Sequence, residues 1–155
     1  MTVADIVAKH GNSRENLLEI LHDIQAQSVD NSLHQEDLTE LAALMRIPVA
    51  DIVGTASFYT MFSLEPRGRH IVRVCESPPC YIMGEENVLE ALQVKLGVAI
   101  GQTTSDGQFT LETTSCLGVC GVAPAMMIDD VVYGNLTAAK VGDIVDQVAA
   151  AAARS

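Results

Sequence analysis

The stretch His70-Ile-Val-Arg-Val-Cys-Glu-Ser-Pro-Pro-Cys80 joins an alternating, β-branched segment to a short loop that carries two cysteines. Alternation of this kind is typical of a β-strand, so residues 70–75 are predicted to form one. A second pair, Cys116-Leu-Gly-Val-Cys120, holds the other two of the four cysteines. Two ligands close in sequence form half of a metal site, and folding can bring two such halves together.

The pattern after the first cysteine pair changes from helix to strand and back to helix. Apolar residues at helical spacing over 88–96 predict a helix that ends at Gly97. A final helix, with Thr137 as its cap, is predicted to fray in the alanine run 149–153. Between them, β-branched segments predict strands over 109–113, 125–128 and 131–133, with a turn at Asp129-Asp130 joining the last two.

Residues 1–64 have the apolar spacing of a helical bundle. Helix starts are predicted from the spacing of capping residues and from one proline: Asn12 with Glu15, Ser32 with Gln35, and Pro48. The aromatic segment 56–62 is predicted to pack in the core. The alternative is a surface that packs on another part of an assembly.

The polar segment Glu65-Pro-Arg-Gly-Arg69 separates these two patterns and predicts a domain boundary. We therefore expect an N-terminal helical domain over 1–66 and a sheet-containing domain over 67–155. The predicted fold class is α+β, a small sheet with flanking helices preceded by an N-terminal helical bundle.

Composition excludes several classes of function. The formal charge of −11, with 9 Lys and Arg against 20 acids, argues against a nucleic-acid partner. No apolar run has the length of a membrane span, and no basic segment followed by an apolar one indicates a secretory signal. We expect a reducing, cytoplasmic location where stable disulfides are rare. No glycine-rich phosphate loop is present, so no nucleotide site is expected.

The chemistry of the four cysteines has four possible explanations. A disulfide framework is the weakest, because the core is large enough to stand without it. A thioredoxin-type dithiol needs two residues between its cysteines, whereas the gaps here are four and three. A structural zinc site accepts four thiolates, and a [2Fe-2S] cluster takes two thiolates at each iron. Spacing alone leaves zinc and the cluster equally open.

From Leu17 to the last helix, the chain resembles the thioredoxin-like [2Fe-2S] ferredoxins. Within that family it is similar to the small iron–sulfur subunit of NADH-oxidising (diaphorase) modules, which occur in respiratory complex I, NAD(P)-linked hydrogenases and formate dehydrogenases. The matching segments are 18–25, 47–48 with 56–59, Cys75 and Cys80 with Gly84, Cys116-Leu-Gly-Val-Cys-Gly-Val-Ala-Pro124, and Tyr133-Gly-Asn-Leu-Thr137. Residues 28–34 depart from the family, which usually has a glycine-and-proline turn there.

The resemblance implies that Cys75, Cys80, Cys116 and Cys120 ligate one [2Fe-2S] cluster in a thioredoxin-like sheet domain. It also implies a partner flavoprotein subunit that holds FMN and binds NAD(P)H, together with further iron–sulfur subunits. No catalytic residue is then expected on this chain, which would not insert directly into a membrane. Its location would be cytoplasmic, or at the inner face of a membrane through the complex.

The resulting expectation is a one-electron carrier within a larger oxidoreductase. The acids expected near the cluster are Asp106, Glu112, Asp129 and Asp130. Their negative charge would make adding an electron unfavourable, so we expect a low reduction potential. Two alternatives remain open: a zinc-bound interaction module without redox chemistry, and a free-standing [2Fe-2S] ferredoxin, which would not require the helical extension.

Overall fold

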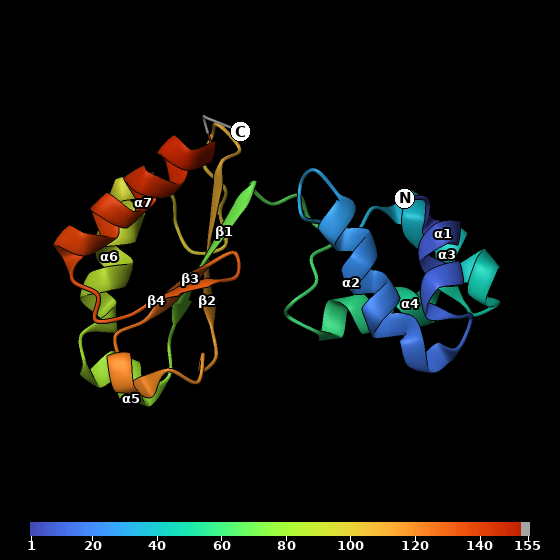
Figure 1. Cartoon of the computed structure of the whole chain (residues 1–155), viewed down its shortest axis with the longest axis horizontal. Helices are drawn as coiled ribbons and strands as arrows, with labels where there is room; N and C mark the ends of the chain where they lie inside the picture. Colours follow the sequence, from blue (N-terminus) through green and yellow to red (C-terminus); the bar gives the residue numbers. More distant parts are fainter. Residues whose placement is uncertain (153–155) are drawn as a thin grey trace. The chain divides into compact units, whose positions relative to one another are not determined.

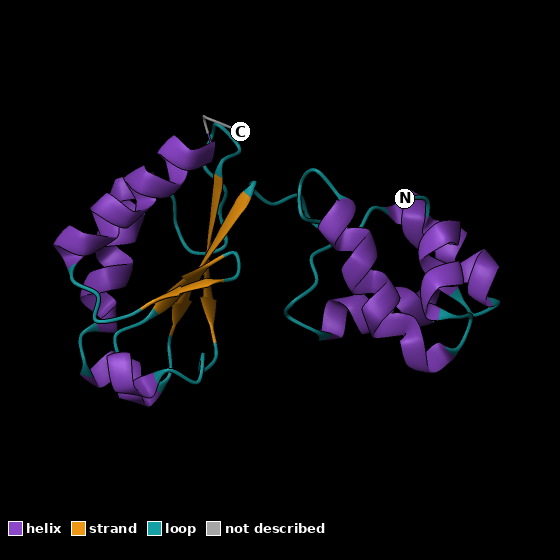
Figure 2. Cartoon of the chain, in the orientation of Figure 1, coloured by secondary structure: helices purple, strands orange, loops and turns teal. Residues whose placement is uncertain are grey.

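The computed structural model describes residues 1–152. Contacts divide the chain into two units, Met1–Arg67 and a second unit that begins at Gly68 (Figure 1). The first unit is helical, and the second combines helices with a four-stranded sheet (Figure 2). The predicted α+β class is therefore confirmed. The last three residues of the chain, including the end of the predicted alanine run, lie outside the described residues.

The helical unit contains four α-helices and one short 3-10 helix among its described residues: α1 Val3–His10, η1 Arg14–Asn16, α2 Leu17–Gln27, α3 Gln35–Met45 and α4 Val49–Phe58. Their apolar faces meet in one core, whose most deeply buried side chains are Ile6, Ile20, Leu21, Leu41 and Ile52. This packing of spaced apolar residues is what the helical periodicity predicts.

Both predicted cap pairs in this unit are wrong. The Asn12 side chain donates instead to the Leu44 carbonyl oxygen, 2.9 Å away. The hydroxyl of Ser32 donates to Asp30, and His34 occupies the N-cap position of α3. A capping box does exist at α1, where Thr2 and Asp5 satisfy each other's backbone N–H groups. Short polar side chains bond to whichever backbone group the fold brings near them, so spacing alone misplaces them.

The aromatic segment 56–62 is only partly core. Ala56 and Phe62 are buried, whereas Phe58, Tyr59 and Met61 face solvent. The prediction of a core segment is thus wrong for its middle residues, because α4 ends at Phe58 and the chain leaves the helical repeat there.

The second unit is a sheet in the order β2-β1-β3-β4. The strands are β1 His70–Cys75, β2 Phe109–Thr114, β3 Met126–Ile128 and β4 Val131–Tyr133. Strand β1 pairs parallel with β2 and antiparallel with β3. Helices α6 Glu85–Leu96 and α7 Ala138–Ala152 pack on each other and cover one face (Figure 1). The packing of these two helices on the sheet buries Val72, Val74, Leu92, Leu111 and Met126.

Two predicted helix boundaries in this unit are confirmed. Gly97 ends α6 with a positive φ of 68°, and the Thr137 hydroxyl accepts the Lys140 N–H at the start of α7. The short helix α5 Pro78–Ile82, which contains Cys80, is absent from the sequence prediction. Five residues are too few to show helical periodicity in a sequence.

The chain passes from one unit to the next between Arg67 and Gly68. Arg67 is held in the helical unit, because its backbone N–H donates to the Asp30 carbonyl and its guanidinium donates to the Asn31 carbonyl at 2.8 and 3.0 Å. The Gly68 N–H donates to the Thr110 hydroxyl in the sheet unit. Residues 28–34, which depart from the family pattern, thus supply the carbonyls that fix the end of the helical unit.

Among residues 1–152, no helix is both long and apolar enough to span a bilayer.

Candidate metal centre

The strand register brings both cysteine pairs to one end of the sheet. Cys75 is the last residue of β1 and lies opposite Thr114, the last residue of the parallel strand β2. Cys116 follows Thr114 by two residues. Because parallel strands end at the same edge, the two cysteine loops leave the sheet side by side.

The first pair is buried. Cys75 and Cys80 are each 2% exposed and pack against Ala123 and Leu117. Pro78 stands at the start of α5, where its missing N–H costs no helical hydrogen bond. The helix then turns Cys80 back toward the end of β1.

The second pair is exposed and has the spacing of two ligands on one metal. The Sγ atoms of Cys116 and Cys120 are 3.6 Å apart. Two sulfurs bound at about 2.3 Å to one tetrahedral ion lie about 3.8 Å apart. Gly118, between them, has φ +79° and donates its N–H to the Cys116 sulfur at 3.4 Å. A side chain would strain this turn, which explains the glycine.

Backbone N–H groups converge on the buried sulfurs. Burial by itself would raise the pKa of Cys75, but N–H groups of Ser77 and Leu117 donate to its sulfur and bring the pKa below its usual value. Burial, followed by the neighbouring Cys75, raises the pKa of Cys80. The pair therefore gives up its first proton more easily than its second, and a bound cation would balance the second charge.

The exposed pair behaves in a similar way. Its partner Cys116 raises the pKa of Cys120, first through the sulfur–sulfur hydrogen bond and then through charge. A bound cation would offset the repulsion within each pair and stabilise both thiolates. Four thiols arranged in this way are a chemically suitable ligand set for iron.

The four thiols are grouped as two pairs at the same end of the sheet. A [2Fe-2S] cluster needs two thiolates at each of two irons, and two separate thiol pairs provide them. The donor set therefore fits this cluster.

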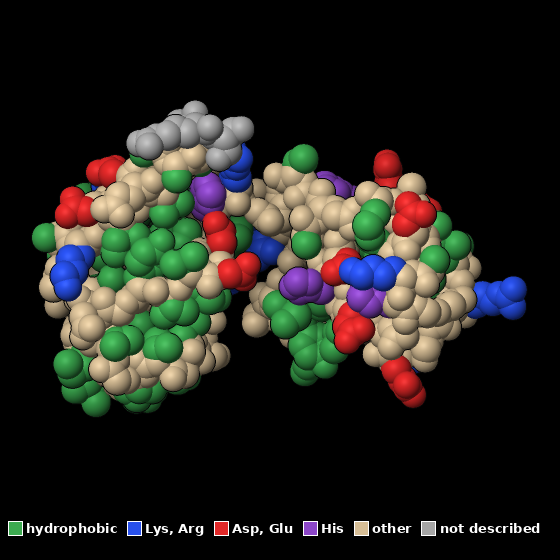
Figure 3. Space-filling model, in the orientation of Figure 1, with side chains coloured by type: hydrophobic (Ala, Val, Ile, Leu, Met, Phe, Trp, Pro, Cys, Tyr) green, Lys and Arg blue, Asp and Glu red, His purple; other side chains and the backbone are tan. Residues whose placement is uncertain are grey.

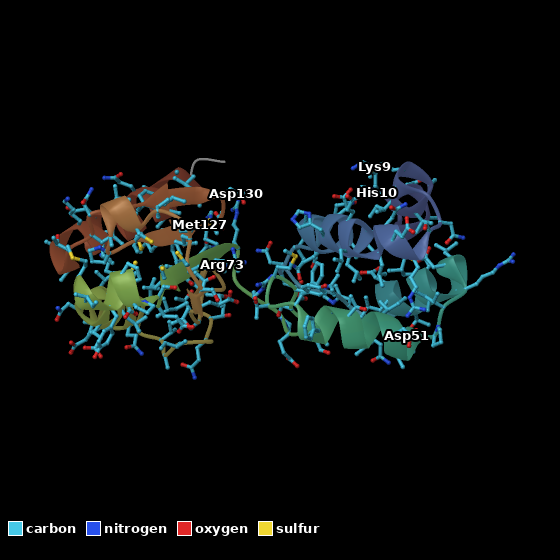
Figure 4. The ribbon with its side chains drawn as sticks, turned by 90° about the horizontal axis from the view of Figure 1, so that it is seen from below. Lys9, His10, Asp51, Arg73, Met127 and Asp130 are labelled. Carbon is cyan, nitrogen blue, oxygen red and sulfur yellow. The ribbon has the colours of Figure 1, made fainter. Side chains whose placement is uncertain are left out.

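The histidines do not belong to the site. Each lies against a carboxylate elsewhere: His10 and His22 near Asp23, His34 near Asp30, and His70 near Asp129. His10 lies beside Lys9 on α1 (Figure 4).

Three of the four carboxylates expected beside the cysteines, Asp106, Asp129 and Asp130, lie elsewhere, and the expectation is wrong for them. Asp129 accepts the Ile71 N–H at 3.0 Å and contacts His70, at the start of β1. Asp130 follows Asp129 in the chain and lies past the paired residues Arg73 and Met127, on the side away from Cys75 (Figure 4). His70 lies five residues before Cys75 along β1, which corresponds to a distance of about 16 Å.

Of the other two expected acids, Asp106 is distant from the ligands and Glu112 is not, because Glu112 lies two residues before Thr114, the β2 residue paired with Cys75. Asp106 accepts the Gln108 N–H just before β2 begins, at the end of the sheet opposite Cys75. Glu112 pairs with Arg73 across β1 and β2, with 3.4 Å between Oε2 and Nε.

Two further acids on the cysteine side are Glu76 and Glu85, which no sequence pattern singles out. Glu76 follows Cys75 directly, and Glu85 opens α6 with 5% exposure. Burial, then the charges of Glu86 and Glu76, raise the pKa of Glu85. Loops that follow strands are expected to offer backbone N–H groups to sulfur, and the structure identifies the donors as Ser77, Leu117 and Gly118. The sequence does not distinguish these donors, because every residue except proline has an N–H group.

A thioredoxin-like sheet with helices on one face and four thiols at one end defines a class of iron–sulfur proteins. The chain belongs to the thioredoxin-like [2Fe-2S] ferredoxin family, whose sequence model matches residues 3–149. This confirms the resemblance and the prediction of one [2Fe-2S] cluster as the cofactor, and it decides between cluster and zinc in favour of the cluster.

Two relatives illustrate the family. The chain is 48% identical over 96 residues to a subunit of the NADH-quinone oxidoreductase of Pseudomonas aeruginosa, covering 62% of this chain and 58% of the relative. It is 37% identical over 129 residues to the HndA subunit of the NADP-reducing hydrogenase of Solidesulfovibrio fructosivorans, covering 83% and 74%. The chain thus spans little more than half the length of the Pseudomonas relative.

A solved structure of an NAD+-reducing [NiFe]-hydrogenase in the air-oxidized state shares the fold. The TM-score is 0.78 at 25% identity, and the match covers 92% of this chain but 24% of the hydrogenase chain. In that enzyme the fold is one part of a much longer polypeptide.

Proposed function

We propose that this chain is an electron-transfer subunit of a multisubunit oxidoreductase, beside an FMN-containing partner that oxidises NAD(P)H. Cys75 and Cys80 hold one iron of the [2Fe-2S] cluster, and Cys116 and Cys120 hold the other. The observation that carries this proposal is the meeting of two thiol pairs at one end of the sheet, the exposed pair near ligand spacing.

The cluster supplies reversible storage of one electron. The chain's own residues provide the ligands and the surroundings. The N–H groups of Ser77, Leu117 and Gly118 point at sulfur and stabilise its negative charge. The buried pair excludes water from one side, whereas Cys116 and Cys120 are exposed and form the edge through which an electron can enter or leave.

An apolar surface beside the cysteines fits a protein partner. Tyr81, Ile82 and Met83, which directly follow Cys80, are all exposed. Hydrophobic side chains gather at the end of the sheet unit where α5 lies (Figure 3). Three consecutive exposed apolar side chains next to a redox site are typical of a docking surface.

The relatives support assembly into a larger enzyme. They are named as subunits of NADH-quinone oxidoreductase and of an NADP-reducing hydrogenase. We place this chain in a complex of that kind: an NADH dehydrogenase, an NAD(P)-linked hydrogenase or a formate dehydrogenase. Further iron–sulfur subunits accept the electrons, catalysis lies on the partner, and the location is cytoplasmic or at the inner face of a membrane.

The test is anaerobic purification of the chain, followed by metal and sulfide analysis. About two irons and two acid-labile sulfides per chain are expected, with an EPR signal that appears only on reduction. Cys116→Ser should lose or perturb that signal, whereas Ser115→Ala should keep it. Stoichiometric zinc in a colourless protein would contradict the proposal. Copurification with a flavoprotein distinguishes the subunit from a free-standing ferredoxin.

A further inference from the structure

The helical unit exposes aromatic side chains that its own core does not use. Phe58, the last residue of α4, is 77% exposed, and Tyr59, Met61 and Leu64 after it are also exposed. Hydrophobic side chains gather at the lower edge of the helical unit, where the last turn of α4 lies (Figure 3). A contiguous group of this kind is unusual on a surface that only meets water.

Phe58 and Tyr59 border a hollow of about 510 Å³ between the start of α2 and α4. We call it the aromatic groove; its lining residues include Leu18, Gly54, Phe58 and Tyr59. Gly54 keeps the hollow open, because nothing lies within 4 Å of the position a Cβ would take there. The volume falls within the range of sites that bind a few side chains of a ligand.

The aromatic rings are held in place by the core. The rings of Phe58 and Tyr59 meet edge to face with centroids 5.0 Å apart, and Tyr59 meets Phe62 in the same way at 6.4 Å. Phe62 is buried. The groove is therefore largely formed before any ligand arrives, which lowers the entropy lost on binding.

The groove also carries negative charge. Glu15 and Asp51 line it, together with a single cation, Arg14, which is paired with Asp51 at 2.7 Å. Aromatic faces beside carboxylates attract Lys and Arg side chains, through the ring quadrupole and through charge. The partner that fits is an apolar segment bearing at least one cationic side chain.

We propose that the aromatic groove docks a cation-bearing apolar segment of the NAD(P)H-oxidising flavoprotein partner, as a second contact separate from the cysteine surface. This inference rests on the proposed function for the identity of the partner. It assigns to the helical unit a role in assembly that the cluster site does not need.

The test measures binding of the full, cluster-loaded chain to the FMN-containing subunit by calorimetry. Phe58→Ser should weaken the affinity about tenfold or more, as the loss of an aromatic anchor does at an interface. Val29→Ser is the matched control, because Val29 is 94% exposed on the same unit and lies outside the groove. Its affinity should stay within about twofold of the wild type.

A second pair of variants tests charge. Glu15→Lys should slow association and reduce its dependence on salt, whereas Glu40→Lys, which changes the net charge equally on α3, should do neither. Both measurements keep the proposal testable even if one variant folds poorly, which circular dichroism would reveal.

The outcomes are distinguishable. Wild-type affinity in both Phe58→Ser and Glu15→Lys, with the wild type binding the flavoprotein, overturns the groove and leaves the proposed function intact. Failure of the wild type to bind the flavoprotein overturns both. A dimer of this chain that Phe58→Ser abolishes would show that a second copy occupies the groove, and that too overturns the proposal.

Discussion

Removing the charge of Glu76 should change the reduction potential of the cluster, whereas removing the charge of Asp130 should leave it nearly unchanged. Glu76 is adjacent to Cys75 in the chain, and neighbouring Cα atoms are about 3.8 Å apart, so its carboxylate lies within about 8 Å of the ligand. A unit charge at that distance shifts a one-electron potential by about 20 mV in water, and by more at lower effective permittivity. Glu76→Gln removes a negative charge and should raise the potential by tens of millivolts.

Asp130 provides the matched control. It lies about 16 Å from Cys75 along the strand, which reduces its effect to about 10 mV before screening. Salt at physiological strength screens exposed charges beyond about 8 Å, so a few millivolts or less should remain. The assay is an EPR-monitored redox titration of the full chain carrying Glu76→Gln or Asp130→Asn. A shift in Asp130→Asn as large as that in Glu76→Gln would refute the electrostatic reasoning.

Two further predictions concern stability. Gly68→Ala should destabilise the sheet unit by about 1–3 kcal/mol, since an added Cβ would lie 2.8 Å from the backbone of β2. Gly142→Ala, in the open middle of α7, should stabilise it by about 1 kcal/mol; chemical denaturation compares the two, and equal effects would contradict the packing argument. Hydrogen bonds from His10 and then Lys9 lower the pKa of Asp23 to about 2. Because the folded pKa lies below the unfolded one near 4, this contribution is present above pH 4 and is lost as pH falls toward 2. Asp23→Asn should flatten melting temperature against pH in that window, and an unchanged slope would show that the carboxylate is not the cause.

Sequence reasoning located the helices and strands that have a clear period and missed the features that do not. The strand from His70 to Cys75 and the helix that ends at Gly97 were both predicted, because alternation and a glycine cap are visible in the residues. The cap pairs at Asn12 and Ser32 were wrong, because a polar side chain bonds to whatever the fold brings near it. The short helix that carries Cys80 was missed because it has too few residues to show a period.

The positions of the acidic residues in space also could not be predicted from their positions in the sequence. Asp129 and Asp130 lie near the second cysteine pair in sequence, so they were expected near it in space. The antiparallel pairing of β3 with β1 carries the chain away from the cysteines, and the acids emerge at the far end of the sheet. A short separation in sequence therefore spans the length of a strand.

The sequence by itself determined the class of chemistry, because four cysteines in two close pairs are a ligand set wherever they fold, and their glycine and proline context matches one family. Only the tertiary structure decided which pair is buried, which N–H groups face sulfur, and which acids surround the site. Ligand identity is a property of individual side chains and can be read along the chain. Burial and electrostatic neighbourhood depend on strand register and on the direction of each strand, which are set by contacts between residues distant in sequence.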